Sequence, residues 1–447
     1  MNISKYIFPI IDGAIITFIT MTTLAGNLSV SDRVFLLITL IILAFTMLIM
    51  FAKGFYSDEK CCLKKTYTLF ESLAISIAAL SVIAAVFKTT FWIYFLLFAC
   101  SIYIFICIFV VRLAYCLLKK LFVRTKNVLI VGAGQGGKLI AEEIQSRPEL
   151  GLNVVGFLDD NMNNIEDEDS TIPILGLTCD SEAVIKDNNV QLVIIAVKSR
   201  MDSDILTDII KGIPLSVKVW RMPKFYEKIA HKYLVSKMTV NWLFYSCVKK
   251  KAILYSYIKR FFDIAASIAI MAITLPISII AIVGIKLSDL GPIFYTQMRT
   301  GKYGKTFKMI KFRTMYQEDP EQSFDDDIDE VSADDKRIMP FCKILRKFHI
   351  DELPQMINVL RGDMSLVGPR PVREEVHFEN KDKVPYWECR SWVHPGWCGW
   401  QQANINSPSA EEQLEYDLYY IKHRNIIWEM AIFVRYIIKL VTGKGRN

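Results

Sequence analysis

The sequence predicts a membrane protein in three parts, and three observations support this class. The hydrophobic fraction is 52% and the mean hydropathy is +0.29, both high for a purely soluble protein. Four long apolar runs open the chain, and a strand, a glycine-rich turn and a helix pattern follow them. We therefore expect a four-helix transmembrane bundle over residues 1–120, a Rossmann-like α/β domain over residues 121–245, and an α-rich domain over residues 250–447.

The bundle is predicted from run length and from the placement of charge. The four runs cover residues 6–27, 34–52, 68–87 and 91–118. Each approaches or exceeds the ~20 residues that cross a hydrocarbon core. Lysine and arginine follow the second and fourth runs, so the positive-inside rule places both ends of the bundle in the cytosol. The first run lacks a small-residue cleavage site and is not read as a cleaved signal peptide.

Charge and cysteine usage exclude other classes. The net charge is +7, and basic residues gather beside apolar segments, which favours a membrane surface over nucleic acid as the partner. No zinc-finger spacing or nucleic-acid-binding motif is present. The ten cysteines contain no C-x-x-C pair, so reduced thiols are expected rather than a disulfide framework.

The second part begins with "KNVLIVGAGQGGKLIAEEI" at Lys126, which reads as a buried parallel strand, a glycine turn and a helix. The spacing of Gly132, Gly134 and Gly137 fits a dinucleotide fingerprint, and Asp159 or Asp160 is placed to meet a ribose. Two interpretations stay open. The domain binds NAD or another nucleotide, or it is a degenerate nucleotide fold kept as a regulatory or packing module.

A fifth apolar run, Phe261–Ile285, opens the third part. Basic residues flank it on both sides (Lys259, Arg260 and Lys286), and Pro276 interrupts its helix pattern. A full crossing would place the rest of the chain outside the cell, away from the second domain. We expect a re-entrant helix at about residues 258–285 that enters one leaflet, breaks at Pro276 and returns, with the break sheltered by protein.

The chemistry is concentrated in "HIDELPQMINVLRGDMSLVGPRP", which begins at His349. Asp351 is expected to cap a helix whose first turn holds Glu352 and Pro354. Alone, this would be an acidic cap on a structural helix, but lysines and arginines crowd the surrounding sequence. A carboxylate can attack phosphorus, and Mg²⁺ with guanidinium groups offsets the repulsion between two anions. The pattern therefore favours an anionic substrate, and the membrane helix favours one carried in the membrane.

Residues 255–443 resemble the bacterial sugar transferases that are monotopic phosphoglycosyl transferases. The matching motifs occur in the same order as in that family. They are "IKRFFDI", "GPIFYTQMRTGKYGKTFKMIKFRTM", "DDKRI", "LRKFHIDELPQMINVLRGDMSLVGPRP", "HPGWCGW" and "YDLYYI". The four runs and the nucleotide-type domain resemble the long form of the family, typified by undecaprenyl-phosphate galactose or glucose phosphotransferases. The third domain is therefore expected to be the catalytic domain.

The resemblance implies transfer of a hexose 1-phosphate from a UDP-sugar to polyprenyl (undecaprenyl) phosphate, with release of UMP. Such a transfer is the first membrane step of exopolysaccharide, capsule or O-antigen synthesis, and it proceeds by ping-pong kinetics through a phosphosugar-aspartyl intermediate. It implies a multi-pass protein of the bacterial inner membrane with its active site on the cytosolic face, in contact with lipid. The identity of the sugar and the formation of a homodimer are left open.

Site residues follow from the same resemblance. Asp351 would be the nucleophile, and Glu352 would help it to hold Mg²⁺ or would orient the site. Lys259, Arg260 and Pro276 belong to the re-entrant segment. The residues expected to bind substrate are Arg299, Lys311, Arg313, Arg346 and Arg370, with Asp417 as a supporting carboxylate.

The chain departs from the family pattern at two places. Leu275 stands where a serine commonly precedes the proline, so Thr274 or Ser278 is expected to satisfy a freed carbonyl. Trp397 and Cys398 replace smaller or branched residues in a region expected to shape sugar or acceptor choice.

Two other functions are kept as alternatives. A nicotinamide-dependent membrane oxidoreductase or epimerase would use the glycine fingerprint together with Tyr255-x-x-x-Lys259, and bound NAD would favour it. A non-catalytic scaffold of a polysaccharide export complex would leave the acid pair and its basic surroundings without a role.

Overall fold

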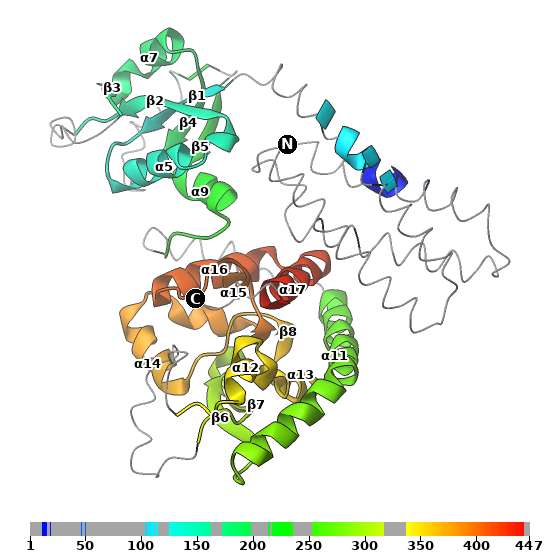
Figure 1. Cartoon of the computed structure of the whole chain (residues 1–447). Helices are drawn as coiled ribbons and strands as arrows, with labels where there is room; N and C mark the ends of the chain where they lie inside the picture. Colours follow the sequence, from blue (N-terminus) through cyan, green and yellow to red (C-terminus); the bar gives the residue numbers. More distant parts are fainter. Residues whose placement is uncertain are drawn as a thin grey trace. The chain divides into compact units, whose positions relative to one another are not determined.

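A computed structural model describes residues 125–161, 172–197, 213–214, 217–235, 253–316 and 337–441, with residues 11–15, 18, 46, 50, 103–104, 106–111 and 113–114 of the amino-terminal part. The four predicted spans lie largely outside the described residues, so the bundle stays a prediction. The chain divides into two compact units, Met1–His231 and Lys232–Asn447 (Figure 1).

The first unit contains a five-stranded parallel sheet in the order β3-β2-β1-β4-β5. The strands are β1 (Lys126–Val131), β2 (Leu152–Leu158), β3 (Ile174–Gly176), β4 (Val190–Ile195) and β5 (Lys218–Arg221), and the helices are α5 (Gln135–Gln145), α7 (Ser181–Asp187) and α9 (Met222–Ala230). β1 is apolar and buried from its third residue onward, as expected for a central parallel strand covered on both faces. The chain order reverses between β1 and β4, which is the point where such sheets form a ligand crevice. The predicted Rossmann-like α/β fold is confirmed.

The second unit is α-rich and carries two small sheets, antiparallel β6-β7 and parallel β8-β9. Its elements are α11 (Ile253–Ser288), β6 (Phe294–Thr300), β7 (Thr306–Phe312), α12 (Cys342–Lys347), η6 (Ile350–Glu352), α13 (Gln355–Arg361), β8 (Ser365–Val367), α14 (Glu374–Lys383), η7 (Trp387–Trp392), β9 (Gly396–Cys398), α15 (Trp400–Asn404), α16 (Ala410–His423) and α17 (Ile426–Val441). The core gathers around β8 and β9, where Leu366, Cys398 and Leu418 are fully buried.

α11 is the one helix of the described residues that is long and apolar enough to cross a membrane. Its 36 residues would extend about 54 Å if straight. The expected break at Pro276 is not found, because α11 continues through Pro276, although Figure 1 shows that it changes direction along its length. Pro276 has no N–H to donate to the carbonyl of Ala272, and the Thr274 hydroxyl donates to the Ile270 carbonyl at 2.7 Å. Both features bend a helix without ending it.

Both ends of α11 pack against the rest of the second unit, while its middle is exposed. Near the start, the Arg260 guanidinium donates to the carbonyls of Val359 and Leu360 at 2.6 and 2.7 Å and so caps the carboxyl end of α13. Near the end, Ala281 and Ile285 are buried against α12. The apolar side chains between them face outward, among them Ile273, Leu275 and Ile280.

Candidate active site

The acid pair lies in η6, the single turn between α12 and α13. Residues three apart in such a turn lie on one side of it, and Ile350 and Leu353 pack into the cluster that holds the end of α11. Asp351 and Glu352 therefore face another direction. The expectation that Asp351 caps the following helix is wrong, because α13 starts later and its N-cap is Pro354.

The two carboxylates have different surroundings. Glu352 is 5% exposed, and its Oε1 lies 3.2 Å from Nζ of Lys311. Burial opposes the charged form of Glu352, but the charges of Lys311, Arg370 and His349 outweigh it and lower the pKa to about 2. Asp351 is only half-buried. Glu352 is thus a fixed, paired anion, whereas Asp351 is the more accessible carboxylate.

The turn that carries Arg370 packs closely, backbone against backbone, on a second segment of the chain. Directly after β8, the backbone nitrogen of Gly368 donates to the carbonyl of Cys398 at 2.9 Å. A Cβ at Gly368 would collide with the carbonyl of His394, and a Cβ at Gly396 would collide with the Gly368 nitrogen. The segments "LVGPRP" and "HPGWCGW" therefore pack together only if residues 368 and 396 are glycine. The Arg370 charge acts on Glu352, which places this turn beside the acid pair.

Arg346 lies in the last turn of α12, also near the acid pair. The buried Cys342 thiol of the same helix lies close enough to three charged side chains for them to shift its pKa. Burial and, after it, the charge of Asp351 raise its pKa to about 11, against the opposing charges of Arg313 and Arg346. The structure thus brings together Asp351, Glu352, Lys311, Arg346 and Arg370.

Two other predicted residues, Arg313 and Arg299, make contacts within the protein itself. The Arg313 guanidinium lies 2.5 Å from Asp289, directly after α11. The guanidinium of buried Arg299 donates to Gln297 at 2.7 Å and to the Pro371 carbonyl at 3.4 Å. These contacts fix the ends of α11, β6 and the 368–371 turn.

Asp417 is fully buried, and its Oδ2 accepts hydrogen bonds from Nε and Nη2 of Arg390 at 3.0 and 2.9 Å. Burial raises the pKa of Asp417 to about 6, although the charge of Arg390 lowers it. Asp417 is therefore a partner of Arg390, a residue that sequence reasoning did not identify.

Sequence reasoning also missed Tyr436 of α17. It is 4% exposed and its ring lies 5.5 Å from that of Trp397, in an edge-to-face contact. Burial and then the charge of Glu352 raise the pKa of Tyr436 well above its usual value. Tyr436 is therefore near the acid pair, and no sequence signal distinguished it from the other apolar positions of its helix.

The acid pair can be tested for a fit to Mg²⁺. No cluster of three or more His, Cys, Asp or Glu side chains suited to a metal occurs within the described part of the chain. Mg²⁺ is commonly bound through one or two carboxylates, with substrate phosphates and water completing its shell. The oxygens of Asp351 and Glu352 fit that partial donor set.

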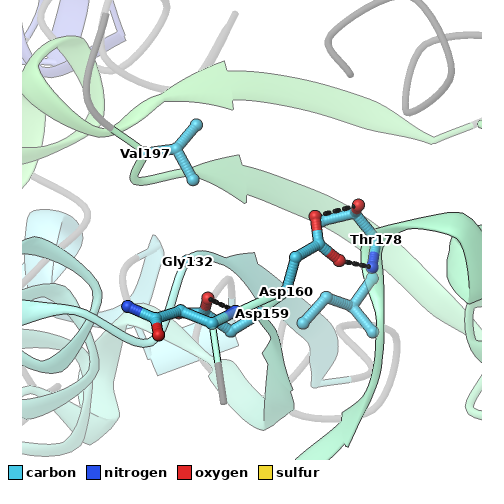
Figure 2. Close-up of a pocket in the computed structure, with 7 residues that line it drawn as sticks. Gly132, Asp159, Asp160, Thr178 and Val197 are labelled. Carbon is cyan, nitrogen blue, oxygen red and sulfur yellow. Dashed lines mark hydrogen bonds between the residues drawn. The ribbon is translucent and has the colours of Figure 1, made fainter. Parts of the chain in front are cut away.

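The first unit has a separate cavity of about 400 Å³ at the carboxyl ends of β1, β2 and β4 (Figure 2). Gly132 has a φ of 103°, and a Cβ at Gly137 would collide with the Gly132 carbonyl, so both glycines are required by the turn. Nothing lies within 4 Å of a Cβ built at Gly134. Asp159 accepts from the Ala133 nitrogen at 2.6 Å. Next to it, Asp160 accepts from the backbone nitrogen of Thr178 at 2.7 Å.

Tyr255 and Lys259, the pair that suggested an oxidoreductase, both bind Glu429. The Tyr255 hydroxyl donates to Glu429 at 2.5 Å, and Lys259 Nζ lies 3.1 Å from Glu429 and 2.9 Å from Asp263. They connect α11 to α17 within the second unit, whereas the glycine turn belongs to the first.

Two family models match the chain: one described as bacterial sugar transferase, over residues 254–443, and one described as CoA-binding domain, over residues 52–213. The UDP-N-acetylgalactosamine-undecaprenyl-phosphate N-acetylgalactosaminephosphotransferase of Aeromonas hydrophila is 34% identical over 43% of this chain and 45% of its own length. The uncharacterized sugar transferase EpsL of Bacillus subtilis is 34% identical over 42% of this chain and 89% of its own length. The UDP-glucose:undecaprenyl-phosphate glucose-1-phosphate transferase of Xanthomonas campestris pv. campestris is 28% identical over 72% of this chain and 68% of its own length. The chain thus spans less than half of the Aeromonas relative.

Proposed function

The chain belongs to the bacterial sugar transferase family, and we propose that it transfers a hexose 1-phosphate from a UDP-sugar to undecaprenyl phosphate, in exopolysaccharide, capsule or O-antigen synthesis. The observation that carries this proposal is the asymmetry of the acid pair. Glu352 is buried and paired with Lys311, while its neighbour Asp351 is accessible among cationic side chains. A carboxylate that lies among fixed positive charges is suited to attack a phosphate.

The reaction has two displacements at one phosphorus atom. A carboxylate oxygen of Asp351 attacks the β-phosphorus of the UDP-sugar, and the bond to the bridging oxygen of the α-phosphate breaks, which releases UMP. An oxygen of undecaprenyl phosphate then attacks the same phosphorus and expels the Asp351 carboxylate. The products are undecaprenyl-diphosphate-sugar and the free enzyme.

The surrounding side chains have separate roles in this proposal. Lys311 keeps Glu352 ionised and in place, and Arg370 and Arg346 bind phosphate oxygens. Asp351 and Glu352 would hold Mg²⁺ together with the diphosphate of the donor. When bound, Mg²⁺ supplies positive charge that offsets the repulsion between the carboxylate and the phosphates.

The membrane arrangement is proposed from α11. Both of its ends contact one unit while its exposed middle is apolar, which supports a helix that enters and leaves on the same face of the bilayer. If α11 crossed the bilayer, its two ends would lie on opposite faces. The rest of the second unit could then not contact both ends, as it does. We infer that the active site faces the cytosol of a bacterial inner membrane and that the amino-terminal runs form four spans.

The role of the first unit is a separate proposal. The cavity at Gly132 and Asp159 supports nucleotide binding, and NAD is one candidate ligand. The oxidoreductase alternative loses support, because Tyr255 and Lys259 are engaged with Glu429.

UMP release tests the proposed function. Purified protein in lipid nanodiscs with undecaprenyl phosphate should release UMP from at least one member of a UDP-sugar panel. The Asp351→Asn variant should insert into membranes normally and release none. Release by that variant at the parent rate would exclude Asp351 as the nucleophile, and no release by the parent from any UDP-sugar would count against the transferase.

A further inference from the structure

The backbone of the Arg370 turn accepts hydrogen bonds from two buried guanidinium groups. Nη2 of Arg390 donates to the carbonyl of Arg370 at 2.8 Å, and Nη1 of Arg299 donates to the carbonyl of Pro371 at 3.4 Å. The two arginines come from η7 and β6, so the turn is fixed from two distant parts of the chain. Its backbone therefore has little freedom to move relative to the acid pair.

Arg390 is itself held on several sides. Its guanidinium binds Asp417 through two nitrogens, and its central carbon lies 4.4 Å from the centre of the Trp387 ring. Trp387 in turn donates from its indole nitrogen to Nδ1 of His377 at 3.2 Å. The orientation of Arg390 is thus fixed by α16 and by the ring on which it stacks.

The buried pair of Arg390 and Asp417 is not explained by folding stability alone. Arg390 is 4% exposed and Asp417 is 1% exposed, so two charges are removed from water. A buried ion pair is often no more stabilising than apolar residues of similar volume. What the pair provides and apolar residues lack is a directed donor to the carbonyl of Arg370.

Arg390 lies beside a small cavity and not beside a space that could hold the donor. The cavity that it lines together with Arg370 and Thr300 has a volume of about 20 Å³. That space is enough for one water molecule and too small for a diphosphate. Any effect of Arg390 on the reaction therefore passes through the residues that it holds.

We propose that Arg390 and Asp417 are positioning residues, which hold the 368–371 turn so that the Arg370 side chain meets the diphosphate of the donor beside Asp351. This inference rests on the proposed function. Arg390 fixes the carbonyl of Arg370, and Asp417 fixes Arg390. A small displacement of such a turn is expected to weaken donor binding, because a misplacement of about 1 Å can cost about 100-fold in rate.

A double-mutant cycle on UMP release tests the coupling. Arg390→Lys keeps the charge but loses the fork that joins Asp417 to the carbonyl, and it should raise the KM for the UDP-sugar by about 10- to 100-fold. In an Arg370→Met background the same change should alter KM by less than about twofold, because the side chain that it positions is gone. Asp417→Asn provides a second variant with the same expected pattern.

Lys232→Met is the matched control, since it removes an ion pair with Glu415 of α16, at 3.1 Å, that lies outside this network. It should lower the melting temperature without changing KM. An equal effect of Arg390→Lys with and without the Arg370 side chain would overturn the inference, as would an unchanged KM in both Arg390→Lys and Asp417→Asn. Absence of UMP release in the parent would instead count against the proposed function.

Discussion

Nζ of Lys311 lies 3.2 Å from Oε1 of Glu352, and this contact separates the roles of two adjacent carboxylates. Lys311 comes from β7, and Glu352 from the turn before α13. The ammonium pairs with Glu352, the buried member of the acid pair, whereas Asp351 is the more exposed member, which we propose to be the nucleophile.

Removal of Lys311 should cost both stability and activity. Lys311→Met leaves Glu352 buried without its closest cation, and loss of one partner of a buried pair typically costs about 3 kcal/mol. We expect a lower free energy of unfolding in urea and at least a tenfold lower kcat for UMP release, since one fixed charge at such a site contributes about 10²-fold. The double variant Lys311→Met with Glu352→Gln should regain most of the stability but not the activity.

Lys186→Met provides the control, because its pair with Glu182 is exposed and such surface pairs contribute little to stability. Equal losses of stability in Lys186→Met and Lys311→Met would show that the buried Lys311–Glu352 pair stabilises the fold no more than an exposed pair does.

The pH dependence should separate Asp417 from Glu352. The pKa of Glu352 is lowered to about 2, so its stabilising contribution is present above the unfolded value of 4.5 and is lost only as pH falls through about 2. The pKa of Asp417 is raised to about 6 from 3.8, so its contribution is present below 3.8 and is lost as pH rises through about 6. Relative to Asp417→Asn, the parent protein should therefore lose stability between pH 4 and pH 7, by thermal unfolding.

Activity should respond to Asp417 in the opposite direction. Ionised Asp417 holds Arg390, so kcat/KM for the UDP-sugar should fall in the parent as pH drops below about 6. Asp417→Asn should lack that part of the profile. An identical acid limb in both proteins would exclude Asp417 as its source.

Labelling at one exposed position after α11 tests the membrane topology. Leu290 is 86% exposed, and a thiol introduced by Leu290→Cys should react with a membrane-impermeant reagent only from the cytosolic side, above the labelling of the parent cysteines. Pro276→Ala restores a backbone donor and should straighten the helix, which would increase labelling from the outside. Labelling of Leu290→Cys from the outside with Pro276 intact would establish a fifth span.

The sequence predicted those features that depend on local pattern. Apolar periodicity identified α11 and the strands of the first unit, and the glycine spacing identified the turn after β1. The stretch that begins at His349 predicted the acid pair as the reactive site, because lysines and arginines surround it and because it resembles the corresponding family motif.

The features that were missed depend on pairings across long sequence distances. Arg299 and Arg313 were predicted to bind substrate, and their contacts to the Pro371 carbonyl and to Asp289 were not foreseen, because no local pattern reveals them. Arg390 lies in a segment that matched no family motif. Its positioning role is seen only in the folded structure, where it binds Asp417 and the Arg370 carbonyl. The capping role expected for Asp351 failed because Ile350 and Leu353 pack on α11 and fix a separate turn before α13.

The most direct test of the central claim is a covalent trap. The protein is incubated with its UDP-sugar in the absence of undecaprenyl phosphate, quenched, digested, and the peptides around residue 351 are analysed by mass spectrometry. We expect a sugar-phosphate adduct on Asp351 of the parent, absent from Asp351→Asn and discharged when undecaprenyl phosphate is added. A parent protein that turns over while its peptides carry no adduct, or that carries the adduct on another side chain, would contradict the account.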